Sequence, residues 1–443
     1  MSARKKVAVI GGGWAGCAAA VELSRRGHGV TLFESARTLG GRARRVEIEG
    51  LSLDNGQHIL LGAYTSTSRL LRLIGVDPGR VLLKLPLQLR YPQGSGGMEF
   101  IAPRLPAPLH LIAAVWLAGG LVLEDKLSLA RFATTARWMD WQLHNDCTVA
   151  ELLARFDQSA RLVRLMWQPL CIAALNTPPE RASAQVFLNV LRDSFGARRV
   201  ASDMLIPRVD LTSLMPQRAA DFIERQGGKV RLGATVEGIR RRQERWQLET
   251  GNGSVEPDGE SNFDAIVVAT QADHAAALLR DLPDAGPDFS FEYEPITTCY
   301  LQYAPNVGLP HPFLALPDDP AAGHRGQFVF DRGRLDPAQA GLLAVVVSAS
   351  AEAIAFGHDR LAGMIATQLS QVFRQSELAR PRWTKVISEK RATFSCTPGL
   401  TRPGNATALE GLVLAGDYTA GGYPATLESA VRSGIAAADC LER

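Results

Sequence analysis

The segment Val7–Glu34 contains a glycine-rich turn between two apolar segments, and it limits the possible folds more than any other part of the sequence. Val7–Ile10 is a short run of mostly β-branched residues, which is typical of a buried parallel strand. Three glycines with the spacing G-x-G-x-x-G follow it and precede an alanine-rich amphipathic helix. A second strand over residues 30–33 ends at Glu34. This order of elements predicts a dinucleotide-binding βαβ unit.

Each glycine of this turn has a separate structural role. Gly11 permits the tight turn from strand to helix, Gly13 lets a pyrophosphate approach the backbone, and Gly16 lets the helix pack closely on the strand. The phosphate charge then faces the free N–H groups and the positive end of the helix dipole. Glu34, about twenty residues further on, can accept hydrogen bonds from a ribose. The residues expected to contact a dinucleotide here are Gly11, Gly13, Trp14, Ala15, Gly16, Glu34 and Ser35.

The composition is that of an ordinary globular protein. The 443 residues suffice for two or three domain-sized units, and 46% of them are hydrophobic while 21% are charged. The net charge of +3 gives no reason to expect nucleic-acid binding. The six cysteines are scattered without a C-x-x-C pair, which argues against a metal site or a disulfide framework and fits a reducing compartment. The first residues, MSARKK, lead directly into the expected strand, so we expect a cytoplasmic protein.

A second glycine-rich turn follows the βαβ unit. Gly40 and Gly41 precede Arg42, just after the expected ribose-binding acid. The backbone N–H groups of the turn and the guanidinium of Arg42 favour a second contact with the pyrophosphate over an ordinary exposed turn. A nicotinamide dehydrogenase does not need this element.

A polar segment, Leu53–Gly62, comes next. Asp54, Asn55, Gln57 and His58 place several hydrogen-bonding groups close together in the sequence. The segment is either a solvated loop or a lining near the reactive end of the cofactor, and we favour the lining because functional groups concentrate in loops. His58 by itself is more typical of a structural histidine than of a catalytic base.

The most apolar segment is Leu105–Leu123. It contains no acidic residue, lysine or arginine, but two prolines, His110 and a Gly119-Gly120 pair interrupt it. A membrane-spanning helix needs ~20 predominantly apolar residues, so we do not expect this segment to span a bilayer. It is either a buried helix pair or a surface that lines a substrate tunnel or contacts the membrane. Peripheral contact with the inner face of the cell membrane is therefore one of the two expectations.

The middle of the chain divides by its periodicity. Apolar residues recur at three- and four-residue spacings from residue 125 to about residue 199, which predicts helices. Within this region, Trp167–Pro178 either lines a cavity or packs in a core. Further on we expect a helix over 214–225, a strand pair over 229–239, a charged hairpin over 240–260, a strand over 263–270 and a block of strands over 297–350.

The C-terminal region again contains a buried strand before a polar turn. Leu412–Ala415 is apolar, and Gly416-Asp417 follows it. A carboxylate at such a strand end can accept hydrogen bonds from ribitol hydroxyls. The N-terminus of the next helix can stabilise negative charge at the N1 and O2 atoms of a flavin. The residues expected to contact the cofactor here are Gly416, Asp417, Ala425, Thr426 and Leu427.

The βαβ unit, the GGR turn and the C-terminal GD turn with its helix together resemble the flavin-dependent amine oxidase and phytoene desaturase superfamily across essentially the whole chain. The resemblance implies an α/β fold in which a discontinuous Rossmann-like FAD-binding domain carries an inserted helical and mixed-sheet substrate domain. It implies FAD as the cofactor, with Val236 near the adenine and with Ala269 and Thr270 ending a strand that returns to the cofactor. Gln271 stands where the superfamily usually has Gly or Pro. We place the FAD-binding domain at residues 1–84, 205–290 and 396–443, and the substrate-binding domain at residues 85–204 and 291–395.

Longer segments, such as DNGQHILLGAY and GDYTAGGYPATLESAVRSG, resemble the hydroxysqualene dehydroxylase family within this superfamily. The resemblance implies reduction of hydroxysqualene, a long apolar isoprenoid, to squalene in hopanoid biosynthesis. An acid would protonate the departing oxygen, and hydride from reduced FAD would quench the allylic cation. The candidates for the acid are His58, Asp54, Tyr423 and Lys390. The sequence contains no second dinucleotide motif, so the external electron donor is not visible in it.

Two other functions remain open. Another isoprenoid or carotenoid desaturase, or an amine oxidase, would run the flavin oxidatively, and an amine oxidase needs an aromatic cage for which Tyr418 and Tyr423 are the nearby candidates. A non-catalytic isoprenoid escort protein of the same fold need not keep its flavin contacts. Because the glycines, Glu34, Arg42 and Asp417 are all present, we expect a flavoenzyme.

Overall fold

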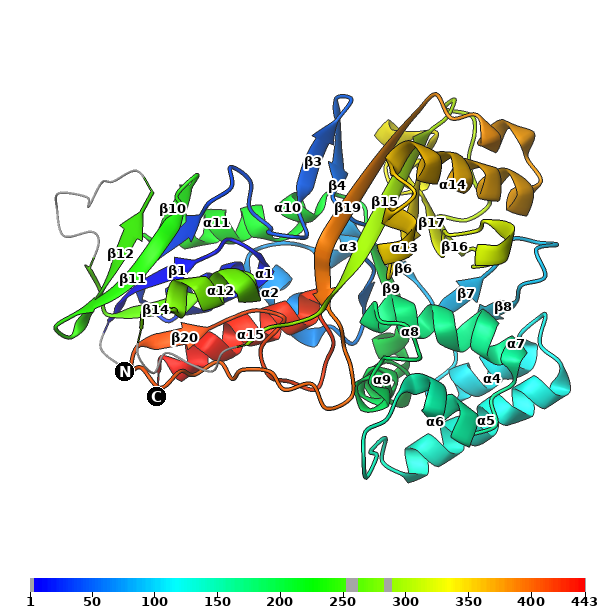
Figure 1. Ribbon diagram of the computed structural model, residues 1–443, viewed down its shortest axis with the longest axis horizontal. Helices are drawn as coiled ribbons and strands as arrows, with labels where there is room; N and C mark the ends of the chain where they lie inside the picture. The colour runs from blue at the N-terminus through cyan, green and yellow to red at the C-terminus, as the bar shows by residue number, and fades with distance from the viewer. Residues whose placement is uncertain (1–3, 252–261, 283–288, 443) are drawn as a thin grey trace.

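The computed structural model describes residues 4–251, 262–282 and 289–442. The chain forms two lobes that lie side by side along the long axis (Figure 1). One lobe is built around a parallel sheet, and the other contains an antiparallel sheet and a group of helices. Two long strands, β15 (Tyr293–Gln302) and β19 (Trp383–Phe394), run between the lobes.

The parallel sheet joins segments from the whole length of the chain, in the strand order β10-β2-β1-β14-β20. Ile10 pairs with Phe33 on one side and with Val268 on the other, and Val268 pairs with Leu414. The carboxyl ends of these strands therefore lie next to one another. This arrangement confirms the predicted βαβ unit and the two return strands. The strands are β1 (Lys6–Ile10), β2 (Gly29–Glu34), β10 (Lys229–Leu232), β14 (Ala265–Val268) and β20 (Leu412–Leu414).

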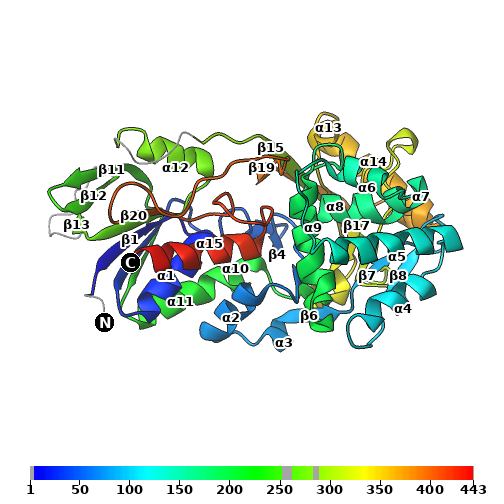
Figure 2. The same ribbon diagram turned by 90° about the horizontal axis from the view of Figure 1, so that it is seen from below.

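The two faces of the parallel sheet belong to different hydrophobic cores. Val7 and Val9 of β1 face one core, and Ala8 and Ile10 face the other, because successive side chains of a strand alternate between its faces. Helices cover one side of the sheet, and a small three-stranded sheet lies on the other (Figure 2). These elements are α1 (Trp14–Arg25), α11 (Pro216–Arg225), α15 (Leu427–Cys440), β11 (Val236–Arg242), β12 (Arg245–Thr250) and β13 (Asn262–Phe263).

The antiparallel sheet has the strand order β16-β17-β18-β15-β19. Cys299 and Leu301 of β15 face a core that they share with α14 (His358–Phe373), whereas Tyr300 faces the large core between the lobes. The expected strands over 298–302 and 342–347 are confirmed as parts of this sheet. Its other strands and the adjoining helix are β16 (Phe313–Ala315), β17 (Phe328–Asp331), β18 (Leu342–Val347) and α13 (Ala351–Ile354).

The helices expected from residue 125 onward are confirmed, and two of them continue into π-helical turns, Val163–Trp167 (η1) and Arg192–Gly196 (η2). Trp167 is buried against Phe132 and Phe187, so the segment that begins with it packs in the core at this point. The helices here are α4 (Leu109–Leu117), α5 (Leu123–Trp138), α6 (Val149–Arg155), α7 (Ala160–Leu162), α8 (Gln168–Leu175) and α9 (Ala184–Leu191).

The apolar segment 105–123 is a surface rather than a buried helix pair. Leu109, Trp116 and Leu117 of α4 are 53%, 50% and 74% exposed, and Leu123 at the start of α5 is 61% exposed. The structure therefore favours the second of the two alternatives, an apolar surface. Within the described ranges, no helix combines the length and the apolar character that crossing a membrane requires.

The prediction that residues 229–239 form a pair of adjacent strands is wrong. Both strands form, but β10 pairs with β2 in the parallel sheet and β11 pairs with β12 in the small sheet. Gly233, with a φ of 67°, lies between them and adopts a left-handed conformation that glycine accommodates without strain. In the expected hairpin over 240–260, β11 and β12 form an antiparallel pair. Its residues 252–260 lie outside the described part of the chain.

Short elements connect the lobes. The predicted domain boundaries near residues 84 and 205 fall inside two strands, β6 and β9, that pair with each other. The division into domains fits the two sheets, but its exact boundaries stay a prediction. The remaining elements, which connect the lobes or lie within one of them, are β3 (Arg45–Ile48), β4 (Leu51–Asp54), β5 (Leu60–Leu61), α2 (Thr65–Leu73), α3 (Pro78–Val81), β6 (Leu82–Leu85), β7 (Gln88–Arg90), β8 (Glu99–Ile101), β9 (Met204–Pro207), α10 (Leu211–Leu214) and α12 (Ala272–Leu279).

Candidate cofactor and active site

The glycine-rich turn lies at the carboxyl end of the parallel sheet. Gly11 has a φ of 106°, and a methyl group there would lie 2.6 Å from the carbonyl oxygen of Ala269. A methyl group at Gly16 would lie 1.9 Å from the carbonyl oxygen of Gly11. Neither position can accept a side chain without moving backbone. These two glycines therefore hold α1 and the end of β14 tightly against β1, and they place Ala269 and Thr270 beside the turn.

Gly13 differs from the other two glycines because the space above it is open. A methyl group there would meet its nearest neighbour, the Cα atom of Gly41, only at 4.0 Å. Gly13 also begins α1 without a side-chain hydrogen bond, so the first turn of the helix keeps N–H groups available for an anion. The GGR turn borders this space, because the Gly40 N–H donates to the carbonyl oxygen of Gly12 at 2.9 Å.

Glu34 is buried at the end of β2, where its carboxylate already accepts two backbone hydrogen bonds. The N–H of Gly12 donates to Oε2 at 2.6 Å, and the N–H of Ala36 donates to Oε1 at 2.8 Å. The hydroxyl of Ser35 donates to Oε1 at 3.2 Å. These contacts fix the carboxylate and leave it further acceptor capacity, so its predicted contact with a ribose stays possible. Val236 begins β11 close by, because the N–H of Ala234 donates to the carbonyl oxygen of Glu34 at 2.9 Å.

Arg42 forms an ion pair with Asp417, a residue from the other end of the chain. Its guanidinium donates to both carboxylate oxygens of Asp417, at 2.6 and 2.7 Å, and to the carbonyl oxygen of Ala392 at 2.6 Å. Burial disfavours the charged guanidinium, but Asp417 outweighs this effect and raises the pKa of Arg42. The sequence predicts that Arg42 contacts pyrophosphate and Asp417 contacts ribitol. The structure brings the two side chains together. Their contacts with the cofactor stay predictions.

Two residues that the sequence analysis missed hold the turn at Gly416. The hydroxyl of Ser433 on α15 accepts the Gly416 N–H at 2.9 Å, and the side-chain amide of Asn405 donates to the carbonyl oxygen of Leu414 at 2.8 Å and to Ser433 Oγ at 2.9 Å. Both lie outside the recognisable motifs, and a lone Asn or Ser has no spacing pattern by which a single sequence would reveal it.

The N-terminus of α15 is capped by Thr426, whose hydroxyl accepts the Ser429 N–H at 3.1 Å. Glu428 is buried in the first turn but points away to α2, where it accepts the N–H groups of Ser66 and Thr67 at 3.0 and 2.9 Å. Its charge is thus compensated by another helix N-terminus. Ala425, Thr426 and Leu427 remain partly exposed, as contact with a cofactor would require.

Asp54 and His58, two of the four candidate acids, lie in the loop that follows β4. Asp54 is buried, and burial raises the pKa of its carboxyl to about 7, although the Leu211 N–H and Arg332 lower it. Nδ1 of His58 donates to the carbonyl oxygen of Gly56 at 3.1 Å. Burial lowers the pKa of His58, the Gly56 contact raises it, and the Arg42 guanidinium lowers it further. His58 therefore lies in the field of Arg42, beside the expected cofactor site.

The other two candidates, Tyr423 and Lys390, have different surroundings. The hydroxyl of Tyr423 donates to Asp193, which lies on the π-helical turn η2, and the guanidinium of Arg432 lies 4.5 Å from the centre of its ring. Lys390 is exposed on β19. The structure thus groups His58 with Arg42, while Tyr423 contacts the helical region and Lys390 faces solvent. All four catalytic roles stay predictions.

A buried polar network supports the loop that carries His58. The hydroxyl of Tyr300 donates to the Asp54 carbonyl oxygen at 2.6 Å and accepts from Gln57 Nε2 at 2.8 Å, while Gln57 Oε1 accepts from Arg332 at 3.1 Å. Arg332 is 3% exposed. This network attaches the loop to β15 and β17. The alternation of strand residues predicts that Tyr300 faces inward, but not which loop it contacts.

The site fits FAD. Open space lies above Gly13, the first turn of α1 is uncapped, and the buried hydroxyls of Tyr418 and Thr298 have no hydrogen-bond partner in the part of the chain that the structure describes. Buried polar groups without a partner are rare and are often completed by a ligand. When bound, FAD would supply a hydride or accept one.

The two tyrosines considered for the aromatic cage of an amine oxidase make separate contacts. Tyr418 stacks on Phe289, with 5.6 Å between ring centres, and also contacts Phe291. Tyr423 contacts Arg432 and Asp193 instead.

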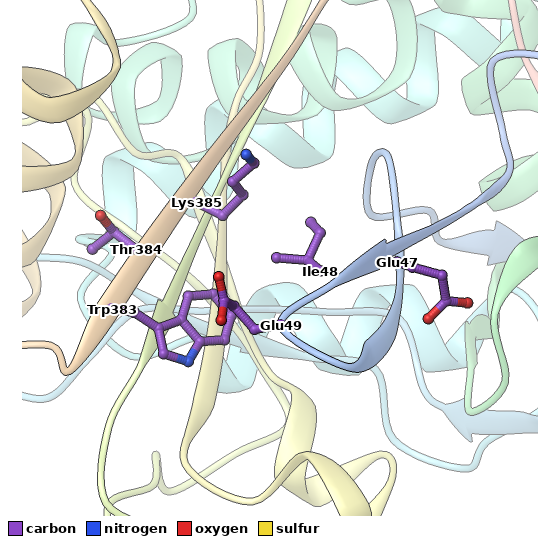
Figure 3. A pocket seen from close by; sticks show the side chains of 6 residues that line it. All are labelled: Glu47, Ile48, Glu49, Trp383, Thr384 and Lys385. Carbon is purple, nitrogen blue, oxygen red and sulfur yellow. The ribbon is translucent and has the colours of Figure 1, made fainter.

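Two cavities lie outside the strand ends. One is a surface pocket of about 230 Å³ between the β3–β4 turn and the start of β19, lined by Glu47, Ile48, Glu49, Trp383, Thr384 and Lys385 (Figure 3). The other is a groove of about 720 Å³ between the parallel sheet and the small sheet, and it reaches Ala234 and Thr235 beside the predicted adenine contact. No predicted site residue lines the first cavity, and its lining carries both acidic and basic side chains.

Comparisons with known proteins agree with this geometry. Residues 14–441 match the model of the family described as flavin containing amine oxidoreductase. The hydroxysqualene dehydroxylases of Rhodopseudomonas palustris and Sinorhizobium fredii are 31% and 29% identical to this chain, over 99% and 98% of it and 98% of each relative. A zeta-carotene desaturase of Synechocystis is 22% identical over 98% of this chain and 97% of that protein. The crystal structure of an oxidoreductase from Methanosarcina mazei shares the fold, with a TM-score of 0.72 at 16% identity over 97% of this chain and 99% of that chain.

The contrast between Gly13 and Gly16 predicts two different effects of an added methyl group. Gly13→Ala should leave folding intact, because its space is open, but should strongly reduce the flavin that copurifies with the protein. Gly16→Ala should destabilise the fold itself, because the methyl group would collide with Gly11. Thermal unfolding and the flavin-to-protein absorbance ratio measure the two effects. Gly363→Ala, where a methyl group meets nothing within 4 Å, is the control. Full flavin content in Gly13→Ala would contradict the predicted phosphate site.

The raised pKa of Asp54 predicts a pH-dependent stability. A folded-state pKa of about 7, above the unfolded value of about 3.9, means that the stabilising effect of the neutral carboxyl is fully present below pH ~4 and is lost as the pH rises through ~7. A shift of this size corresponds to on the order of 4 kcal/mol. Asp54→Asn should therefore gain stability relative to the wild type as the pH increases. Urea unfolding at pH 5 and pH 8 measures this difference, with the exposed Asp140→Asn as the control; an equal difference at both values would refute it.

Proposed function

This chain belongs to the flavin containing amine oxidoreductase family, and we propose that it reduces hydroxysqualene to squalene with FAD as its cofactor. The observation that carries the proposal is the match to relatives of that name along essentially the whole of both chains. The cofactor motifs that such a reaction needs are all present at the strand ends. An FAD-dependent oxidoreductase also explains why the flavin contacts are retained, which a non-catalytic isoprenoid escort would not require.

The reaction breaks the allylic carbon–oxygen bond and forms a carbon–hydrogen bond at the same carbon, while the oxygen leaves as water after it gains a proton. The hydride for this carbon–hydrogen bond would come from bound, reduced FAD. The chain has to bind the cofactor through the α1 and α15 N-termini, exclude water from the reacting carbon, and deliver one proton to the oxygen.

The surroundings of the four candidate acids distinguish their roles. Asp54 holds a transferable proton near neutral pH, because its pKa is about 7. His58, whose pKa is lowered, is neutral at the same pH and is therefore the weaker source of a proton. The hydroxyl hydrogen of Tyr423 is engaged in a hydrogen bond to Asp193, and Lys390 faces solvent. We therefore assign the proton to Asp54 and a binding role to His58, with Tyr423 as the second candidate for the proton.

Oxidative functions fit less well. The carotene desaturases are less similar to this chain than the hydroxysqualene dehydroxylases are. An amine oxidase would need the aromatic cage, but Tyr418 and Tyr423 make separate contacts. A desaturase therefore remains the second candidate, since it would use the same cofactor site and a similar isoprenoid.

We further propose that the exposed apolar residues of α4 and the start of α5 contact the surface of an anionic lipid bilayer at the inner face of the cell membrane. Leu109, Trp116, Leu117 and Leu123 form this apolar surface, and apolar side chains exposed together are typical of an interaction site. Basic side chains of the same two helices and of the residues just before them can complement the negative charge of phospholipids. They are Arg104, Lys126, Arg131 and Arg137, and the exposed acids here are Glu124 and, just after α5, Asp140.

The proposed reaction is tested by a single-turnover experiment without oxygen. Chemically reduced holoenzyme is mixed with hydroxysqualene, squalene or phytoene, and flavin reoxidation and products are followed. We expect reoxidation and squalene with hydroxysqualene alone. Asp54→Asn and Tyr423→Phe should each be examined, and loss of most of the rate with retained flavin identifies the proton donor. No reoxidation with hydroxysqualene would refute the proposed substrate, and oxidation of phytoene by the oxidised enzyme would support the desaturase.

Membrane contact is tested by cosedimentation with vesicles of anionic phospholipid. Trp116→Ser together with Leu117→Ser should lower the bound fraction several-fold, because each large apolar side chain contributes roughly 1.5–3 kcal/mol when it leaves water. Leu232→Ser is the matched control, since this residue is also exposed but lies in the other lobe. Flavin content should not change in the α4 variant; Leu232 lines the groove that reaches Ala234 and Thr235, so its variant serves as a control for lipid binding alone. Equal binding of all three proteins would exclude the α4 surface as the contact.

A further inference from the structure

A buried hydroxyl without a partner lies on the inner face of β15. Thr298 is 1% exposed, and its Oγ1 atom forms no hydrogen bond within the described ranges. Its neighbour Thr297 points to the opposite face, where its hydroxyl bonds to Ser350 and Ser388, each at 2.9 Å. A buried hydroxyl that lacks a partner costs about 1–3 kcal/mol. Thr298 is therefore a position where a ligand can restore a missing hydrogen bond.

His58 lies next to this hydroxyl. A single point above the backbone of Gly56 is 3.8 Å from the Cε1 atom of His58 and 3.9 Å from the Oγ1 atom of Thr298. Both groups therefore border the same small space, and one oxygen atom placed about 2.8 Å from each would bond to both. The absence of a side chain at Gly56 keeps this space free. The guanidinium of Arg42 lowers the pKa of His58 and also bonds to Asp417. The space beside Gly56 is therefore close to the part of the cofactor site that contains Asp417.

The two groups offer complementary hydrogen bonds. The carbonyl oxygen of Gly56 can only accept, so Nδ1 of His58 carries the hydrogen and Nε2 is left as an acceptor. The lowered pKa of His58 agrees with this neutral form. Thr298 has a hydrogen to donate. An alcohol both donates and accepts, and therefore satisfies His58 Nε2 and Thr298 Oγ1 together.

We propose that Thr298 and His58 form the subsite that binds the hydroxyl of the substrate alcohol and so distinguish it from the deoxygenated product. This inference rests on the proposed function, because it names the groups that recognise the hydroxyl of the allylic alcohol. A site built to hydrogen-bond a hydroxyl rejects the analogue that lacks it, since the polar groups of the site are then left unpaired. Squalene would leave both groups unpaired and would be released after the reaction.

The test is equilibrium binding to the oxidised holoenzyme, followed through changes in the flavin spectrum, so that no turnover is involved. For each protein the dissociation constants of hydroxysqualene and squalene are measured, and their ratio reports recognition of the hydroxyl. Thr298→Val replaces the hydroxyl by a methyl group of similar size and should reduce the preference for hydroxysqualene by about tenfold. His58→Phe removes the acceptor and should have a similar effect.

Two controls separate recognition from packing. Thr298→Ser keeps the hydroxyl and should keep the preference. Thr297→Val lies on the same strand but on the other face, so it should affect stability without changing the ratio. An unchanged ratio in Thr298→Val would overturn the subsite even if the wild-type enzyme reduces hydroxysqualene, in which case the proposed function stands. A wild-type holoenzyme that neither binds nor reduces hydroxysqualene would overturn both.

Discussion

The close backbone contact between Gly11, Gly16 and Ala269 is the constraint on which the rest of the cofactor site depends. The atoms here are so near one another that a methyl group at Gly11 or Gly16 would overlap backbone oxygen atoms. The contact brings α1 onto β1 and aligns the end of β14 with the turn. A similar approach recurs at Gly434 of α15, where a methyl group would lie 2.2 Å from the carbonyl oxygen of Ala15. Two helix N-termini are thereby held at the same edge of the parallel sheet, where they favour negative charge.

Polar contacts between distant segments complete this edge. Arg42 and Asp417, which are 375 residues apart in the sequence, form an ion pair, and the Glu428 carboxylate accepts backbone N–H groups of α2 across 362 residues. An ion pair of this kind costs desolvation energy, and removal of one partner leaves the other charge uncompensated. These contacts therefore restrict the arrangement of the segments more than they stabilise the fold. The same principle applies to Tyr300, Gln57 and Arg332, which attach the His58 loop to the antiparallel sheet.

Much of the fold was predictable because it depends on local patterns. Short β-branched runs form buried strands, and glycine spacing identifies the turn, so β1, α1, β2, β14 and β20 were expected at the residues where they occur. The helical region from residue 125 was predicted from periodicity for the same reason. The pairing of β10 and β11 was predicted wrongly, because two strands separated by a short turn form a hairpin or enter different sheets depending on the backbone at Gly233.

The order of the amino acids by itself predicts the cofactor contacts that follow from spacing: the three glycines, the acid after the second strand, and the GGR and GD turns. It also specified an apolar segment at residues 105–123, but not whether that segment is buried, since exposure depends on which surfaces the other helices leave uncovered. The partner of Arg42, the inward position of Thr298 next to His58, and the support from Ser433 and Asn405 required the folded chain. Each is a contact between residues that are remote in sequence, and local propensity and periodicity contain no information about such distances.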